Sequence, residues 1–209
     1  MKRQTKVNLL TGVDRFVLME YDTKLWNQYT EDNKGTEQKQ LSDFIFYNSI
    51  SLGAKKICEA GCNVGNNLSS FTQDYDVCGI DMNEQALASA QNRYPEFRFK
   101  QENLKKISFA DDSFDVVFTR GVLIHIPDED LDDVLSELLR ISKKWVFNLE
   151  YFGEDGKMIE WKRGDNLLWY RNMLQRWQEY PVQIVSDAEI PSHIDSGKTR
   201  YTLVKKNPA

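Results

Sequence analysis

The sequence has 209 residues, of which 41% are hydrophobic and 28% charged, and its formal net charge is −5. This length fits a single domain with a substantial buried core. No apolar run approaches the roughly 18 residues of a membrane span, and no apolar secretory core follows the basic start. Without a cluster of Lys and Arg, a nucleic-acid surface is not expected either. The three cysteines lack metal-ligand spacing, which predicts buried free thiols in a reducing cytoplasm and no metal site.

The first 52 residues predict a helical segment ahead of the main fold. Apolar residues recur at helical spacing between residues 37 and 50, as on the buried face of an amphipathic helix. Trp26 and Tyr29 precede this helix, and aromatic side chains there suit a lid that closes over a ligand. A helix packed on the sheet explains them equally well, and the two interpretations are compatible.

Residues 53–209 alternate short apolar runs with amphipathic stretches. Strands are expected over 56–60, 77–81, 97–100, 114–119 and 145–149, and helices over 65–72, 84–93 and 128–141. This order predicts an α/β fold with right-handed crossovers and helices on both faces of a mostly parallel sheet. A further helix over 166–177 and strands over 182–185 and 200–205 would complete seven strands in one domain.

The most informative segment follows the first predicted strand. Gly61 and Gly65 tolerate the positive φ of a tight turn, and Asn63 is among the few other residues that do. Asp81 ends the second predicted strand, twenty residues after Gly61. A carboxylate there is placed to accept hydrogen bonds from the ribose hydroxyls of an adenosine-containing ligand.

The sequence of the same turn indicates which kind of nucleotide the chain would bind. A dinucleotide fingerprint would have glycine where this chain has Asn63 and Asn66. The turn instead resembles the E-x-G-x-G-x-G pattern of class I methyltransferases, with one departure at Asn63. That resemblance implies a Rossmann-like fold and S-adenosylmethionine as cofactor, and Glu59 at its head suits the positive charge of that ligand.

The resemblance also implies where the rest of the cofactor would bind. In class I methyltransferases an acid and an apolar residue after the third strand hold the adenine; here Asn103 and Leu104 stand there, with Glu102 adjacent. The loop that begins at Arg120 would form the floor of the site. The predicted cofactor-binding residues are Glu59, Gly61, Asn63, Gly65, Asn67, Asp81, Met82, Asn103, Leu104 and Arg120.

Three segments carry a closer resemblance. They are G-C-N-V-G-N-N-L over 61–68, F-T-R-G-V-L-I-H-I over 118–126 and E-Y-F over 150–152. They resemble the methylases associated with pseudaminic acid biosynthesis, and looser similarity extends from Trp26 to Lys205. Asp165 and Asn172 depart from that family's pattern. The resemblance implies methyl transfer to a small-molecule acceptor and suggests a sugar or nucleotide-sugar of a surface-glycan pathway.

Candidate catalytic residues follow the fourth and fifth predicted strands. His125 is either a general base that accepts a proton near neutral pH or a loop-fixing histidine. Glu150 and Tyr151 lie at the same edge of the sheet and are predicted to be catalytic. Trp26, Arg163 and Arg171 are the predicted substrate-binding residues, the arginines through bidentate contacts to an anionic group; surface ion pairing would explain both arginines nearly as well.

The sequence alone is compatible with further functions. A nucleic-acid amino-methyltransferase commonly carries Asn/Asp-Pro-Pro-Tyr/Phe after the fourth strand, where this chain has T-R-G-V over 119–122. A protein methyltransferase and a non-catalytic cofactor-binding subunit are also compatible with the sequence. The near-complete turn and Asp81 favour an active enzyme, and the oligomeric state is left open.

Overall fold

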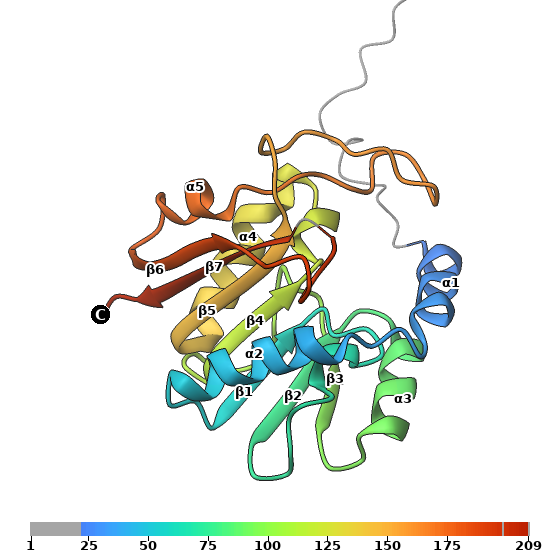
Figure 1. Ribbon diagram of the computed structural model, residues 1–209, viewed down its shortest axis with the longest axis horizontal. Coiled ribbons are helices and arrows are strands. Elements are labelled where there is room, and N and C mark those ends of the chain that lie inside the picture. The colour runs from blue at the N-terminus through green and yellow to red at the C-terminus, as the bar shows by residue number, and fades with distance from the viewer. Residues whose placement is uncertain (1–21, 198, 209) are drawn as a thin grey trace, which may run out of the picture.

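The computed structural model describes residues 22–197 and 199–208, so the first 21 residues of the predicted N-terminal segment lie outside it. Within the described residues the chain forms one seven-stranded sheet in the order β3-β2-β1-β4-β5-β7-β6 (Figure 1). The strands are β1 (Lys56–Ala60), β2 (Asp76–Asp81), β3 (Arg98–Gln101), β4 (Phe114–Arg120), β5 (Ser142–Tyr151), β6 (Val182–Glu189) and β7 (Thr199–Lys206). The helices are α1 (Thr23–Asn33), α2 (Lys39–Ser51), α3 (Glu84–Arg93), α4 (Asp128–Ile141) and α5 (Met173–Trp177), with single turns η2 (Asn66–Leu68) and η3 (Leu123–His125).

The sheet is mixed rather than wholly parallel. Strands β1 to β5 pair in parallel, whereas β7 pairs antiparallel with both β5 and β6. No helix crosses over between β6 and β7 in the described chain, and a connection this short permits only an antiparallel return. The predicted Rossmann-like fold with seven strands is confirmed, and its last two strands form an antiparallel hairpin.

Helices cover both faces of the sheet. On β4 the neighbours Val116 and Val117 are completely buried in different core clusters, one beneath α2 and the other beneath α4. A strand with two buried faces requires a nearly continuous apolar run, which is the pattern that the sequence shows there. The carboxyl ends of β1, β2 and β4 therefore meet at one edge of a rigid sheet.

Two predicted helices are much shorter than expected. The helix expected over 65–72 is reduced to the 3₁₀ turn η2, because the Ser42 hydroxyl of α2 receives the Ser70 N–H and donates to the Asn67 carbonyl. The helix expected over 166–177 begins only at Met173. Asn166 has a left-handed φ of 57°, and Trp169 donates its N–H to the Ile124 carbonyl instead of to a helical neighbour.

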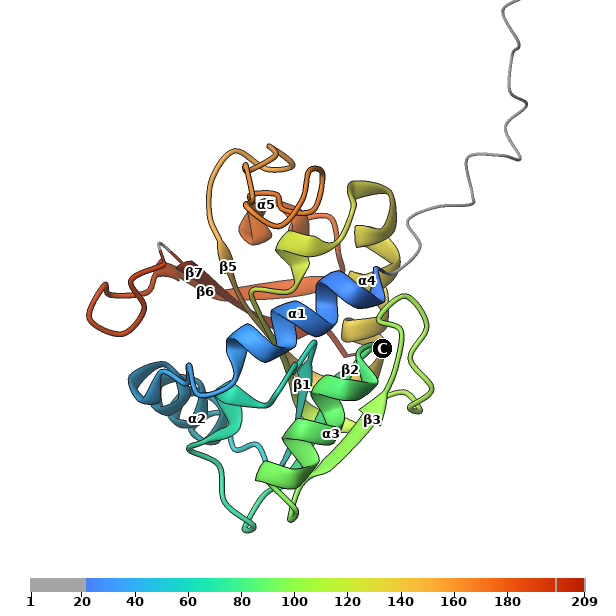
Figure 2. The same ribbon diagram turned by 90° about the vertical axis from the view of Figure 1, so that its right-hand side faces the viewer.

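Helix α1 lies across the carboxyl edge of the sheet. The Asp22 side chain caps it by accepting the Leu25 N–H at 3.0 Å. Its far end is joined to the turn after β1, where Asn66 donates to the Asn33 carbonyl at 2.8 Å. Figure 2 shows α1 between α2 and the segment that follows β5.

Candidate active site

A cavity of about 480 Å³ lies between α1 and the carboxyl ends of β1, β2 and β4. Eight of the ten predicted cofactor residues line it; Glu59 and Gly65 do not. Of the predicted catalytic and substrate-binding residues, His125 and Trp26 line the cavity, whereas Glu150, Tyr151, Arg163 and Arg171 do not. The cofactor residues therefore converge on one cavity, and the other set divides between its wall and the structure behind the wall.

The turn after β1 is built around three left-handed residues. Gly61, Asn63 and Gly65 have φ values of 78°, 46° and 74°, which a side chain with a β-carbon tolerates poorly. A Cβ on Gly61 would lie 2.4 Å from Cγ2 of Val122. Glycine at this position therefore lets the turn after β1 pack directly against the loop after β4.

Asp81 joins the turn to the end of β2. Its Oδ2 accepts the Asn63 N–H at 2.8 Å and its Oδ1 accepts the Asn83 N–H at 2.8 Å. Burial raises the pKa of this carboxyl, and the two backbone N–H bonds oppose the shift. Each oxygen keeps a further lone pair toward the cavity, so the carboxylate can both hold the turn and accept from a ligand hydroxyl.

Glu59 is completely buried beneath the turn. Its Oε1 accepts from the Asn67 side chain at 2.7 Å, while Oε2 has no hydrogen-bond partner among the described residues. Burial raises the pKa of Glu59 to about 8. Glu59 thus acts on the cavity through Asn67, which does line it.

The opposite end of the cavity is bounded by the loop after β3. Leu104 is buried and lines the cavity beside Asn103 and Met82. Asn103 Oδ1 accepts the Lys105 N–H at 2.9 Å, which leaves the amide N–H₂ as its free donor. Glu102 instead receives the Ser108 N–H and pairs with Lys100, so the amide is the polar group presented at this position.

Aromatic rings form the wall beside α1. Trp26, Tyr29 and His125 line the cavity, with the Trp26 ring centroid 5.5 Å from Tyr29 and 5.1 Å from His125. Trp161, from the segment after β5, closes this cluster from behind at 5.0 Å from His125. The sequence suggests Trp26 and Tyr29 as lid residues, and their i,i+3 spacing puts both on one face of α1.

His125 is held in one orientation. Its Nδ1 lies 2.6 Å from the Leu167 carbonyl, and burial lowers its pKa to about 4. The ring is therefore neutral at pH 7 and donates through Nδ1, which leaves Nε2 as an acceptor. His125 combines both interpretations of the sequence, since it fixes a loop and also faces the cavity.

Glu150 binds the loop after β4 instead of the cavity. It is 1% exposed, and its carboxylate accepts the Thr119 hydroxyl at 2.8 Å and the Val122 N–H at 3.0 Å. Burial raises its pKa to about 7. Tyr151, next along β5, packs its ring against Gly197 in the β6–β7 connection.

Arg171 binds the same loop from its other side. The guanidinium donates to the carbonyls of Leu123, at 3.0 Å, and Ile126, and it pairs with Asp128 at 2.7 Å. The side chain has no exposed surface, so every bond it makes is internal. Its predicted contact with a substrate has no geometric support, because its donors are already directed at backbone carbonyls.

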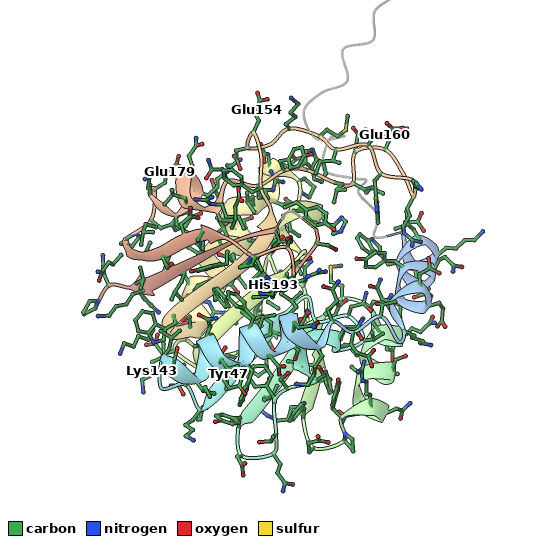
Figure 3. All side chains as sticks on the ribbon, in the orientation of Figure 1. Tyr47, Lys143, Glu154, Glu160, Glu179 and His193 are labelled. Atoms are coloured by element: carbon green, nitrogen blue, oxygen red, sulfur yellow. The ribbon has the colours of Figure 1, made fainter. Side chains whose placement is uncertain are left out.

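Arg163 connects the segment after β5 to α1. Its guanidinium pairs with Asp32 at 2.5 Å and lies 5.4 Å from the centroid of the Tyr29 ring. Glu154 and Glu160 mark this segment in Figure 3. Arg163 therefore lies behind the aromatic wall, where it ties together the two elements that cover the cavity.

Arg120 has a buried partner that its sequence context did not reveal. Its Nη2 lies 3.3 Å from Oδ2 of Asp195, a residue that is 2% exposed in the β6–β7 connection. His193, which the sequence places near Asp195, is an exposed side chain (Figure 3). Asp195 reaches β4 because the hairpin of β6 and β7 pairs with β5, and the sequence near Arg120 contains no sign of that pairing.

The left-handed turn, the carboxylate at the end of β2 and the cavity beyond the sheet edge together resemble the cofactor site of S-adenosylmethionine-dependent methyltransferases. The sequence profile of a family described as "Methyltransferase domain" matches residues 57–144. Among the described residues, no group of three or more His, Cys, Asp or Glu could hold a metal ion. Nor is any helix there long and apolar enough to cross a membrane.

Curated relatives match about half of the chain. Methyltransferase phqN of Penicillium fellutanum is 32% identical over 43% of this chain and 29% of its own length. Trans-aconitate 2-methyltransferase of Variovorax paradoxus is 23% identical over 54% of this chain and 43% of its own. The chain thus spans less than half the length of these relatives.

Solved structures share the fold over most of the chain. Magnesium protoporphyrin IX methyltransferase from Synechocystis, crystallised with bound SAH, has a TM-score of 0.67 at 16% identity and covers 93% of this chain and 100% of its own. A putative methyltransferase complexed with the Trm112 activator from Haloferax volcanii has a TM-score of 0.70 at 13% identity, over 90% and 98% of the two chains. These likenesses concern the fold.

Proposed function

We propose that this protein transfers the methyl group of S-adenosylmethionine to a small polar acceptor bound beside the aromatic wall. One observation carries the proposal: Asp81, the left-handed turn and the aromatic wall border the same cavity. A cofactor in the turn would therefore lie next to a space that an acceptor can enter. The chemistry supplied by the cofactor is an electrophilic methyl group on a sulfonium.

The residues at the turn fit this cofactor. Asp81 would accept the ribose hydroxyls, Leu104 and Met82 would flank the adenine, and Asn103 would donate to the adenine through its amide. The methionine part would lie over Gly61 and Asn67, which both line the cavity. Glu59 supports the site by holding the Asn67 side chain at 2.7 Å.

The protein's contribution to the reaction would be positioning and exclusion of water. In-line attack on a methyl group depends on holding nucleophile and electrophile in near-attack geometry. Helix α1 and the segment after β5 cover the cavity, and residues 22–52 of the N-terminal segment would act as a lid. Glu150 and Arg171 would hold the loop that carries His125, and Trp26 with Tyr29 would face the acceptor.

The resemblance to the methylases of pseudaminic acid biosynthesis supports a sugar or nucleotide-sugar acceptor. The aromatic wall is consistent with that, because Trp and Tyr rings pack well against the apolar face of a sugar. Among the relatives, trans-aconitate is a small polar acceptor in the Variovorax enzyme's name. A small acceptor is common to both indications.

Calorimetry with the full chain tests the proposal. S-adenosylmethionine and S-adenosylhomocysteine should bind with micromolar affinity, roughly −8 kcal/mol, and NADH should not compete. Asp81→Asn should weaken binding by about 10-fold or more, because the amide N–H₂ that replaces one oxygen can accept neither a backbone N–H nor a ribose hydroxyl. Absence of binding by both sulfur compounds would overturn the proposed function.

A further inference from the structure

Arg120 is a cationic side chain of the cavity wall whose guanidinium has unused hydrogen-bond donors. It ends β4 and lines the cavity, and 24% of its side chain is exposed. Its Nε is buried without a hydrogen-bond partner among the described residues. One hydrogen bond of its guanidinium is formed there, from Nη2 to Asp195 at the long distance of 3.3 Å. An unpaired buried donor on a charged group is costly, which indicates that a ligand completes its bonding.

Asp195 does not neutralise Arg120 by itself. Its Oδ1 accepts the Gly197 N–H at 2.9 Å, and its Oδ2 accepts the Thr199 hydroxyl at 2.8 Å. The carboxylate is thus shared among three donors, of which Arg120 is the most distant. It orients the guanidinium and leaves the remaining N–H groups for a second anion, which a planar fork binds best as a carboxylate.

Arg120 lies close to the aromatic wall, beside which the acceptor would bind. Burial raises the pKa of Tyr29, and the positive charge of Arg120 opposes that shift, so the guanidinium lies near the aromatic wall. The polar groups of the turn that would hold the cofactor are instead Asn63, Asn67 and Asp81.

The cavity wall also offers no strong base among the described residues. The His125 imidazole has a pKa of about 4 and already uses Nδ1 on Leu167. Of the carboxylates that line the cavity, Asp130 pairs with Lys105 at 2.6 Å, Asp22 caps α1 and Asp81 accepts two backbone N–H groups. A sugar hydroxyl has a pKa far above 7 and must lose its proton to a base during methylation. None of these groups can serve as that base. A carboxylate is ionised at pH 7 and attacks without losing one.

We propose that the methyl acceptor is a carboxylate bound by Arg120 and that the product is its methyl ester. This rests on the methyl transfer proposed above and specifies the substrate class. A carboxylate oxygen attacks the sulfonium methyl, the carbon–sulfur bond breaks as the carbon–oxygen bond forms, and the electron pair remains on sulfur. The sulfonium and carboxylate charges cancel, so no proton is released and no base is needed.

The first arm of the test asks which carboxylate Arg120 binds, because S-adenosylhomocysteine also has one. The full chain and Arg120→Gln are titrated with S-adenosylhomocysteine and with its decarboxylated analogue. Arg98→Gln is the matched control, since Arg98 pairs with Asp76 on the exposed edge strand. We expect Arg120→Gln to change the affinity for S-adenosylhomocysteine by less than threefold. A loss of tenfold or more that disappears with the decarboxylated analogue would assign Arg120 to the cofactor and overturn the proposal.

The second arm measures transfer of a radiolabelled methyl group from S-adenosylmethionine. The acceptors are a panel of aliphatic, aromatic and sugar carboxylic acids, each paired with its primary amide. We expect label on acids and not on the amides, release of the label as methanol in mild alkali, and a kcat/KM about 100-fold lower in Arg120→Gln. Arg120→Lys, which keeps the charge without the fork, should recover part of that loss.

Three results of the second arm would overturn the ester. They are alkali-stable label, equal transfer to the amides, and no transfer to any acid by a protein that binds S-adenosylhomocysteine. If S-adenosylhomocysteine does not bind at all, the proposed function fails instead, which the first arm shows separately.

Discussion

The two halves of the cavity wall are built in different ways. The cofactor half consists of the turn after β1, the end of β2 and the loop after β3, and its main contacts are local, such as Asn63 N–H to Asp81. The acceptor half consists of the loop after β4, the segment 152–172 and α1. Its main contacts are made by buried ionisable side chains, Glu150 and Arg171, to backbone groups distant in sequence.

Glu150 and Arg171 are complementary around the loop after β4. The carboxylate accepts backbone N–H groups at Val122 and Ile124, and the guanidinium donates to carbonyls at Leu123 and Ile126. Backbone polar groups buried in an irregular loop need such partners, because no helix or strand supplies them. The comparison teaches that charged residues near a cavity serve its architecture when protein groups take up all their hydrogen bonds. They are available to ligands when, as in Arg120, donors remain unused.

Arg171→Met should have the largest effect. It removes a buried guanidinium and leaves two carbonyls unpaired, which should lower the free energy of unfolding by about 3–5 kcal/mol. Urea denaturation measures this, with Arg98→Gln as a surface-arginine control. The folded fraction should still bind S-adenosylhomocysteine, since the cofactor half is untouched. A cost below about 1 kcal/mol would show that Arg171 does not hold the loop.

Gly61→Ala tests the contact between the two halves. The left-handed φ and the collision with Val122 should together destabilise the protein by about 2–4 kcal/mol. Gly53→Ala is the matched control, because its φ is 76° and a Cβ there would meet nothing within 4 Å. Val122→Ala in the Gly61→Ala background should recover only the part of the destabilisation that the collision with Val122 causes. Equal effects at Gly61 and Gly53 would mean that the halves do not touch there as described.

Glu150 makes the stability of the protein depend on pH. Its pKa is about 7 in the fold against a usual value of 4.5, so the folded protein holds a proton that the unfolded chain releases. The stability it contributes is complete below pH 4.5 and is lost as the pH rises to 7, by about 3 kcal/mol. His125, with a pKa lowered to about 4, has the opposite dependence, since its contribution is present above pH 6.5 and is lost toward pH 4.

Glu150→Gln separates these two contributions. The difference in unfolding free energy between wild type and variant should shift in favour of the glutamine as the pH rises from 4.5 to 8, while the His125 contribution cancels between them. Urea denaturation across that range measures the difference. A difference that is constant with pH would show that Glu150 does not titrate abnormally.

Most helices and strands around the cofactor half are predicted correctly because their signals are local; the helix expected over 65–72 is the exception. The limits of β1, α3 and α4 agree with the predicted 56–60, 84–93 and 128–141. In α3 the Asn83 side chain caps the helix at the Ala86 N–H, and the apolar spacing of α4 identifies its buried face.

The acceptor half is harder to predict because its partners are far apart in sequence. Arg171 binds a carbonyl 48 residues away, and Asp195 reaches Arg120 across 75 residues. The backbone of residues 152–172 forms hydrogen bonds within the segment, at Lys157, and outside it, to Tyr151 and the loop after β4. No periodicity in the sequence predicts these bonds. A tryptophan-rich stretch with apolar spacing therefore suggests a helix where the chain is extended.

Arg163→Gln should have the smallest effect on stability and a measurable one on ligand exchange. Arg163 and Asp32 form an ion pair of which both side chains are about one-third exposed, and such pairs contribute about 0.2–1 kcal/mol. Because the pair joins α1 to the segment 152–172, its loss should speed the release of S-adenosylhomocysteine by about 2–5-fold in stopped-flow experiments. Lys34→Gln is the matched control, because Lys34 follows α1 directly and pairs with Glu31 of the same helix. This variant should leave the release rate unchanged. Salt provides the second check: at about 0.5 M the wild-type rate should approach that of the variant, because screening weakens an exposed pair. If both variants release the ligand at the wild-type rate at every salt concentration, α1 is held over the cavity by its aromatic contacts alone.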